Sequence, residues 1–342
     1  MRVLVIGGTR FMGRQLAWRL IAAGHEVTLL NRGTHPDPFG GRVARLRADR
    51  TTPAFARALA GLSFDAAVDF AAFRREDAEG VVAALDGRVG HYVMISTGQV
   101  YLVKEGGNAG GGAPAREEDY DGPLMAEPPA GHRDHGDWAY GIGKRGGEDA
   151  LAAAWASRGF PSTRLRIPIV NGERDDSRRL ESYVWRILDH GPLLLPDGGR
   201  ARLRQVYSGA VVSALMRVLG DPATFGRAYN VCQEETPTLA ELAALLAELL
   251  GAPPPRVAGP PAAEIEGAGL DPIAASPFST RWKSFLDPGR GQRELGLVHP
   301  PLRVYMDKVL THLLAAWPAE PPAGYAQRPR EIEIARPRPG RP

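Results

Sequence analysis

The feature that most limits how this chain can fold is a glycine-rich segment near its start, residues 7–13 (GGTRFMG). A short apolar run at residues 3–6, with β-branched members, precedes it and predicts a buried parallel strand. Apolar residues at helical spacing follow from Leu16 to Ile21, and Gly24 is placed to end that helix. A strand, a glycine turn and a helix in immediate succession predict the first unit of a parallel α/β sheet.

The same alternation continues along the chain. Further strand-like runs, separated by helix-like segments, occur at residues 25–30, 64–70, 91–97 and 162–170. Crossovers between such strands place helices on both faces of one sheet. We therefore predict an α/β fold, with a doubly wound parallel (Rossmann) sheet over residues 1–168 and a smaller C-terminal α/β substrate domain over residues 169–318.

Two segments depart from this rhythm. Residues 102–138 contain GGNAGGG and several prolines, too many for a regular element, and predict a loop insertion that closes over a ligand. Helix is expected to resume at residues 140–156. Residues 319–342 are rich in proline and arginine and predict a tail without fixed structure.

Composition narrows the class of protein. The net charge of +3 equals the charge of residues 326–342 alone, which hold five arginines and two glutamates, so the rest of the chain is nearly neutral. A nucleic-acid partner is therefore not expected, because such binders concentrate positive charge on a folded face. The single cysteine, Cys232, excludes an intrachain disulfide, and no run of about 20 apolar residues predicts a membrane span. We expect a soluble, cytoplasmic chain without a membrane partner.

The glycine-rich segment is also the strongest functional signal. Glycine at the turn lets backbone N–H groups approach a pyrophosphate at the positive end of the helix dipole, and Gly13 permits close packing of helix on strand. This context predicts a dinucleotide site. The contacts expected from this segment are Gly7, Thr9, Arg10, Phe11, Met12 and Gly13.

The end of the second strand indicates which dinucleotide is bound. An NAD site normally places a carboxylate there, on the adenosine ribose. This chain has Asn31 and Arg32 instead, with Arg10 in the glycine loop nearby. Guanidinium groups without a carboxylate suit a 2′-phosphate, so NADP is favoured and NAD is the alternative.

A tyrosine and a lysine four residues apart supply the expected chemistry. Tyr140 and Lys144 share one face of a predicted helix. A neighbouring ammonium favours the phenolate, so Lys144 is expected to lower the pKa of Tyr140 toward the range useful for proton transfer. His132 and His135 lie near two aspartates, but no matching cluster accompanies them and no metal is predicted.

With these motifs the chain resembles the extended short-chain dehydrogenase/reductase superfamily, in its branch of NAD(P)-dependent epimerases and dehydratases. The resemblance covers roughly residues 1–315. Besides the glycine loop and the Tyr/Lys pair, it rests on residues 96–101 (STGQVY), 166–172 (RIPIVNG), 204–207 (RQVY), 228–231 (AYNV), 286–287 (LD) and 293–296 (RELG). The GGTRF glycine loop is most similar to a sub-branch that holds chloroplast stem-loop RNA-binding proteins and bacterial reductases.

The resemblance implies roles for individual residues. Thr97 would hydrogen-bond the reacting oxygen, Tyr140 would be the acid/base, and Lys144 would hold the nicotinamide ribose. Asp49 matches an adenine-contacting aspartate loosely, and Ala71, with Ala72, matches the small residues along the cofactor. The predicted substrate contacts are Gln99 and Arg204. The resemblance also implies a homodimer.

Departures from the family pattern narrow the reaction. Sugar-nucleotide dehydratases carry Asp and Glu where this chain has Gly98 and Gln99, which cannot transfer the protons of a dehydration. Epimerases commonly carry an Asn where this chain has Ile169. The sequence therefore predicts an oxidoreductase that interconverts a carbonyl and an alcohol on a small molecule. A nucleotide-sugar 4-epimerase is the first alternative, and a non-catalytic NAD(P)-sensing or RNA-binding relative is the second.

Overall fold

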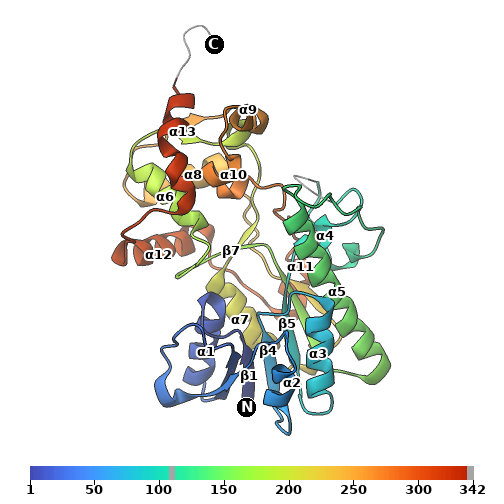
Figure 1. Ribbon diagram of the computed structural model, residues 1–342. Helices are drawn as coiled ribbons and strands as arrows, with labels where there is room; N and C mark the ends of the chain where they lie inside the picture. Colours follow the sequence, from blue (N-terminus) through green and yellow to red (C-terminus); the bar gives the residue numbers. More distant parts are fainter. Residues whose placement is uncertain (108–111, 337–342) are drawn as a thin grey trace.

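The computed structural model, which describes residues 1–107 and 112–336, contains a seven-stranded parallel sheet with helices on both faces (Figure 1). In spatial order its strands are β10 (Ala228–Asn230), β6 (Ser162–Ile167), β5 (Tyr92–Thr97), β4 (Ala66–Asp69), β1 (Arg2–Ile6), β2 (Glu26–Asn31) and β3 (Val43–Arg47). The strand order reverses between β1 and β4, as in doubly wound folds. The predicted fold class is confirmed.

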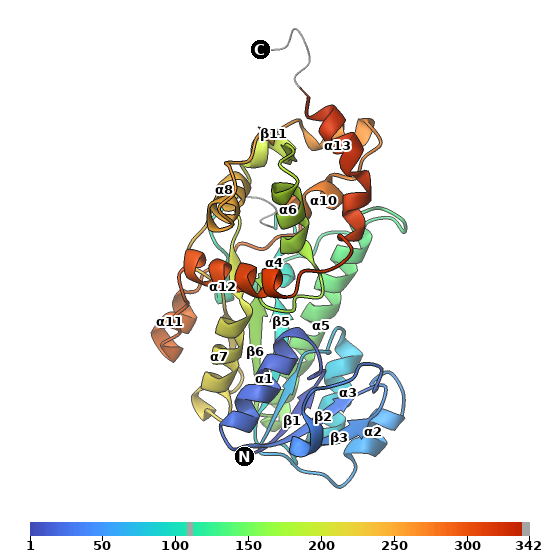
Figure 2. The ribbon, with the colours of Figure 1, turned by 90° about the vertical axis from the view of Figure 1, so that its left-hand side faces the viewer.

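Alternating side chains of the strands build two apolar layers. In β1, Val3 and Val5 join the core on one face, while Leu4 and Ile6 join the core on the other. The first face is covered by α1 (Phe11–Ala22) and α7 (Ser208–Val218), and the second by α2 (Ala54–Leu59), α3 (Arg75–Leu85) and α5 (His135–Arg158). Figures 1 and 2 show the sheet between these layers.

A second region lies beyond the carboxyl ends of the strands (Figures 1 and 2). It contains two small parallel sheets, β7 (Ile169–Asn171) with β9 (Gln205–Tyr207) and β8 (Leu193–Leu194) with β11 (Val257–Ala258). Its helices are α6 (Arg179–Leu188), α8 (Leu239–Leu249), α9 (Ala262–Gly267), α10 (Pro272–Ala275), α12 (Leu302–Ala315) and α13 (Arg328–Ile334). Two further helices are α4 (Gln99–Leu102), after β5, and α11 (Gly289–Leu295), beside β10.

The predicted division after residue 168 does not separate the two regions completely, because a later part of the chain belongs to the main sheet. Pro168 lies between β6 and β7, where its missing N–H and fixed φ end the first strand, so the single run expected at residues 162–170 is two strands in different sheets. The chain later returns with α7 and β10 to complete the main sheet. Part of the segment assigned to the substrate domain therefore belongs to the sheet.

Two elements differ from the sequence expectation. The edge strand β3 was not expected, because only Val43 of its five residues is buried and its arginines hide any apolar pattern. Helix α5 begins at His135, five residues before the expected start, so the insertion ends earlier than predicted. Within residues 1–107 and 112–336, no helix is both long and apolar enough to cross a membrane.

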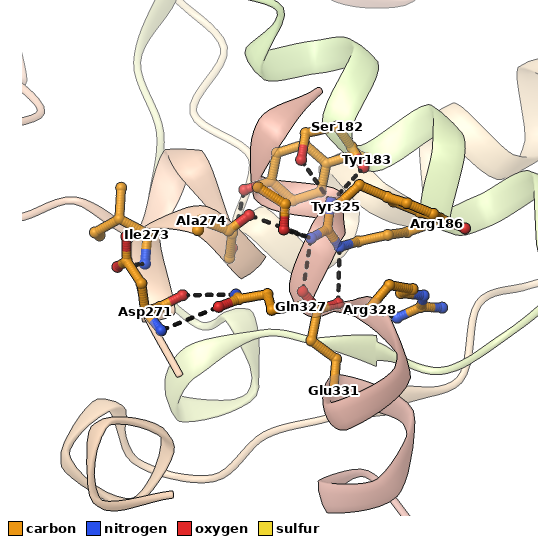
Figure 3. A network of polar contacts seen from close by, with 12 residues as sticks. Ser182, Tyr183, Arg186, Asp271, Ile273, Ala274, Tyr325, Gln327, Arg328 and Glu331 are labelled. Carbon is orange, nitrogen blue, oxygen red and sulfur yellow. Dashed lines mark hydrogen bonds and ion pairs between the residues drawn. The ribbon is translucent and has the colours of Figure 1, made fainter. Parts of the chain in front are cut away.

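The predicted disorder of residues 319–342 is wrong for the part that the structure describes. Residues 323–334 form a 3₁₀ turn followed by α13, and residues 337–342 lie outside the described residues. Figure 3 shows what holds this segment: Glu331 is fully buried and accepts hydrogen bonds from Arg186 of α6. Proline and arginine content indicated disorder, but each buried guanidinium has a carboxylate partner here.

A second arginine extends this network. Arg328 is itself buried, donating two hydrogen bonds to Asp189 and one to Glu331. Arg186 also donates to the carbonyl oxygens of Ala274 and Gly324, so the C-terminal segment is attached to α6 and α10 at several points.

Replacing Glu331 with alanine tests this attachment. The change leaves the Arg186 guanidinium buried without its carboxylate, so we expect the free energy of unfolding to fall by about 3 kcal/mol. Glu333→Ala, an exposed position in the same helix, should change it by less than ~0.5 kcal/mol. Chemical denaturation of the two variants measures the difference, and equal stabilities would contradict the assigned role of the pair.

Candidate active site

The glycine loop brings α1 against the end of β1. A Cβ on Gly13 would lie 2.5 Å from the carbonyl oxygen of Gly7, so only glycine permits this approach. Gly7 has a φ of +85°, a conformation that side chains disfavour. Phe11 also has a positive φ, of 38°, where the loop enters the helix. The resulting turn leaves the N-terminus of α1 open to a ligand.

Two cavities line the carboxyl edge of the sheet, with volumes of about 370 and 420 Å³. The first lies at the ends of β1, β2 and β3, and the second at the ends of β1, β5 and β6. Gly7, Arg10 and Phe73 line both, so the two cavities adjoin. Both lie outside the carboxyl ends of the strands, beside the point where the strand order reverses, which is where dinucleotides bind in doubly wound folds.

The first cavity gathers the residues predicted for the adenosine half. Its lining includes Gly7, Thr9, Arg10, Asn31, Arg32, Asp49 and Ala71. The Asn31 side chain accepts a hydrogen bond from the Gly33 N–H at 2.8 Å. Asp49 accepts from the backbone and hydroxyl of Thr51, and these bonds hold its pKa below the ordinary value.

Sequence reasoning missed the floor of this cavity. Arg50 donates to both carboxylate oxygens of Asp69, at 2.9 and 3.0 Å, and pairs with Asp77 at 3.1 Å. Tyr92 adds a further hydrogen bond to Asp69. Arg50 lies three residues after the end of β3, so recognition of that strand in the sequence would have placed Arg50 at the edge of the cavity. Arg74, His35 and Phe73 also line the cavity and were not predicted.

The second cavity brings the three predicted catalytic residues together. Thr97 ends β5, while Tyr140 and Lys144 face the cavity from α5. A Cβ on Gly143 would lie 2.5 Å from the carbonyl oxygen of Phe73, so glycine at this position lets α5 approach the loop after β4. Phe11, Met12 and Gly13 line this cavity as well.

Lys144 is fixed by its surroundings. Its ammonium donates to the carbonyl oxygen of Ile95 at 2.8 Å and lies 4.8 Å from the ring centre of Phe73. Burial lowers the pKa of Lys144 to about 8, and the charge of Asp69 opposes this shift. The side chain is thus a cation at neutral pH that a modest rise in pH neutralises.

The pKa of Tyr140 is raised, which differs from the expectation that Lys144 would lower it. Tyr140 is 37% exposed through the open cleft, yet its hydroxyl is surrounded by protein and this burial raises the pKa. A hydrogen bond with Thr97 and the charge of Arg179 act in the opposite direction. Lys144 is turned toward Ile95, with its nitrogen 5.9 Å from the phenol ring centre.

Of the two predicted substrate contacts, only Gln99 lies in the cavity. Its amide nitrogen donates at 3.3 Å to Asp137 and at 3.3 Å to the carbonyl oxygen of Trp282. Arg204 does not line this cavity, and its role as a substrate contact stays a prediction. Its guanidinium donates to the carbonyl oxygens of Leu286 and Glu234 and stacks on Phe285.

The substrate side is walled by segments that sequence reasoning did not single out. Thr280, Trp282 and Ser284 form one wall, and Asp175 with Arg179 forms another. Among the described residues of the insertion before α5, none lines this cavity, and its closure over a ligand stays a prediction. It supports Trp282 from behind, through Leu102 and Val103. Asp137, one turn before Tyr140, also lines the cavity and was missed.

The histidines considered for a metal each face a single carboxylate. His132 lies 3.4 Å from Asp134, and His135 lies 3.1 Å from Glu127. No group of three or more metal-ligating side chains occurs within the part of the chain that the structure describes.

Comparison with known proteins agrees with this fold. Residues 3–232 match the model of the NAD dependent epimerase/dehydratase family. A dTDP-glucose 4,6-dehydratase from Streptomyces venezuelae, solved with NAD bound, has the same fold, with a TM-score of 0.69 and 21% identity; 92% of this chain and 97% of that chain are covered.

Two curated proteins are similar in sequence. Chloroplast stem-loop binding protein of 41 kDa b from Arabidopsis thaliana is 25% identical over 270 residues, which cover 75% of this chain and 65% of that protein, just under two thirds of its length. A 2'-dehydrokanamycin reductase from Streptomyces kanamyceticus is 28% identical over 296 residues, covering 84% and 77%.

The family model spans more than half of the chain, and the resemblance to the extended short-chain dehydrogenase/reductase superfamily is confirmed. The GGTRF sub-branch stays a prediction. This chain belongs to the NAD-dependent epimerase/dehydratase family.

Proposed function

We propose that this chain is an NAD(P)-dependent oxidoreductase that interconverts a carbonyl and an alcohol on a small molecule, with NADP as the preferred cofactor. The observation that carries the proposal is that Thr97, Tyr140 and Lys144 line one cavity, the catalytic cavity. It adjoins the cavity that gathers the residues predicted for the adenosine half, the adenosine cavity. A hydride donor lying along these cavities and a proton donor beside it are the two parts that carbonyl reduction needs.

The residues present fit the cofactor. The glycine loop has no side chains where a Cβ would clash, and the small side chain of Ala71 leaves space for the cofactor in the adenosine cavity. When bound, the nicotinamide supplies or accepts the hydride. Lys144 lies where it can hold the ribose, because its ammonium is fixed against Ile95 at the edge of the catalytic cavity.

Tyr140 transfers the proton in this scheme. Its raised pKa keeps the phenol protonated at neutral pH, so that it can donate to the carbonyl oxygen during reduction. Thr97, which hydrogen-bonds the phenol, orients the reacting oxygen and stabilises the charge that develops on it. In the reverse direction the same phenol oxygen receives the proton of the alcohol.

The preference for NADP rests on the charges of the adenosine cavity. Asn31 and Arg32 occupy the position at the end of β2 where a ribose-binding carboxylate would stand. The carboxylate of Asp49 is occupied by Thr51, and that of Asp77 by Arg50. Arg32 is exposed at the rim, where it can meet a 2′-phosphate.

Reduction is favoured over the nucleotide-sugar alternatives. Arg204, the expected partner of a sugar-nucleotide diphosphate, is held by backbone carbonyl groups outside the cavity, and Ile169 lines the wall where epimerases commonly have Asn. One curated relative is, by its name, a reductase of 2'-dehydrokanamycin, which supports the same reaction type. Three catalytic side chains gathered in one cavity also favour an enzyme over a purely NAD(P)-sensing or RNA-binding protein.

Replacing Tyr140 with phenylalanine removes only the proton donor. With a panel of small ketones and NADPH, we expect turnover to fall by roughly 10²- to 10⁴-fold, as loss of general acid–base catalysis does. NADPH binding, followed by fluorescence, should stay within about twofold because the ring remains. Unchanged turnover would contradict the assignment, and NAD retained through purification at one per chain would favour the epimerase instead.

Replacing Arg32 with alanine tests the choice of cofactor. Loss of one charge-assisted hydrogen bond to a 2′-phosphate should weaken NADPH binding about tenfold, while NADH binding stays unchanged. Arg19→Ala removes the same charge from an exposed position of α1 outside both cavities and should leave both affinities as they are. An equal loss for both cofactors would refute the 2′-phosphate contact.

The pKa of Lys144 predicts how cofactor binding depends on pH. The lysine is charged below about pH 8 and neutral above it, so its contribution to NADPH binding is complete at pH 7 and is lost as the pH rises. Affinity should fall about tenfold between pH 7 and 9. The Lys144→Met variant should bind NADPH weakly, with an affinity that does not change between pH 7 and 9. If the affinity of the wild-type protein is equally independent of pH, a charged Lys144 is ruled out as a contact.

A further inference from the structure

The catalytic cavity is lined by five charged side chains, and all but one have a contact of 2.9 Å or less within the protein. Arg10 pairs with Asp176 at 2.8 Å, and Lys144 donates to the Ile95 carbonyl. Arg179 donates to the Ser177 hydroxyl and the Val170 carbonyl. The Asp175 carboxylate accepts from the backbone and hydroxyl of Ser177.

The exception is Asp137. Its Oδ1 has one contact, the Gln99 amide at 3.3 Å, and no cationic side chain among the described residues lies within 4.0 Å of its carboxylate. The nearest opposite charge that affects it, Arg281, is itself paired with Asp134 at 2.7 Å. Burial raises the pKa of Asp137, and the charge of Asp134 adds to this shift.

A purely structural role does not account for this side chain. Asp137 is the third residue of α5, where an acidic side chain often accepts from the N-cap backbone N–H. Here the N-cap N–H of Asp134 donates to His132 instead. The Asp137 carboxylate therefore faces the cavity, one turn from Tyr140 on the same helix.

Resting on the function proposed above, we propose that Asp137 binds an ammonium group of the substrate, so that the enzyme acts on an amine-bearing polyol such as an amino sugar. A half-buried carboxylate is stabilised when a cation hydrogen-bonds it. Side chains three residues apart on a helix are about 5–6 Å apart at Cβ, which places the amine within one sugar ring of the carbon whose oxygen meets Tyr140.

The walls beside Asp137 suit the same ligand. Trp282 and Tyr140 line the cavity, and such aromatic rings pack on the apolar faces of sugars. The Trp282 ring is held in place because its indole N–H donates to Asp134 at 2.8 Å. The two positive side chains nearest the reacting centre, Lys144 and Arg179, enter the cavity from other positions and are engaged with carbonyl groups.

Binding to the NADP⁺-loaded protein, measured by calorimetry, tests the proposal. The probes are glucosamine, galactosamine and kanamycin, each compared with its N-acetylated form, which keeps the ring but loses the charge. At least one free amine should bind roughly tenfold more tightly than its N-acetylated form. In Asp137→Asn the affinities for the free amine and its N-acetylated form should agree within about twofold. Asp137→Glu should recover part of the preference for the free amine.

The control variant is Asp307→Asn, which removes one negative charge from an exposed position of α12 outside the cavity and should preserve the preference. NADP⁺ affinity should be the same in all variants. If no free amine is preferred, or if Asp137→Asn retains the preference, Asp137 does not bind an ammonium group. If NADP⁺ itself fails to bind the wild-type protein, the proposed function fails instead.

Discussion

The position of the proposed proton donor depends on one buried ion pair, between Glu148 of α5 and Arg166 of β6. Arg166 donates to both carboxylate oxygens of Glu148, at 2.6 to 3.0 Å, and Ser96 of β5 donates a further hydrogen bond. Tyr140, Lys144 and Glu148 follow one another at intervals of four residues, so they share a face of the helix. Fixing Glu148 to the sheet therefore holds the other two over the carboxyl ends of β5 and β6.

The same pair explains what the long insertion does. Burial alone would raise the pKa of Glu148, but Arg166, with Arg164 and Ser96, lowers it below the ordinary value. Arg166 also donates to the Tyr101 hydroxyl and to the backbone of Glu117, while the Glu117 side chain accepts from the Asn230 N–H of β10. The insertion is thus bound beneath the catalytic helix and joins it to the edge of the sheet, which leaves the substrate cavity to be walled by other segments.

Short sequence patterns predicted those parts of the protein whose structure depends only on residues close together in the chain. The glycine loop and the Tyr140/Lys144 spacing are short, and their geometry follows from a turn and from helical periodicity. Strand β3 and helix α13 were missed because their arginines resemble loop or tail sequence until the distant partners of their charged side chains, such as Asp189 and Arg186 for α13, are known. Arg204 and Asp137 show the same limit of sequence reasoning. Arg204 belongs to a family motif and Asp137 to none, yet the fold places Asp137 in the cavity lining and Arg204 against the Leu286 carbonyl.

Substrate selection depends on contacts that span most of the chain. Trp282 and Ser284 meet the end of β5 across more than 180 sequence positions, and Ser284 Oγ lies 2.1 Å from where a Cβ on Gly98 would stand. The dehydratase aspartate therefore cannot be restored at position 98 unless the 280–284 wall moves. Absence of that acid and the present shape of the wall are one coupled feature, because the space that an aspartate at position 98 would need is filled by Ser284 and Leu286.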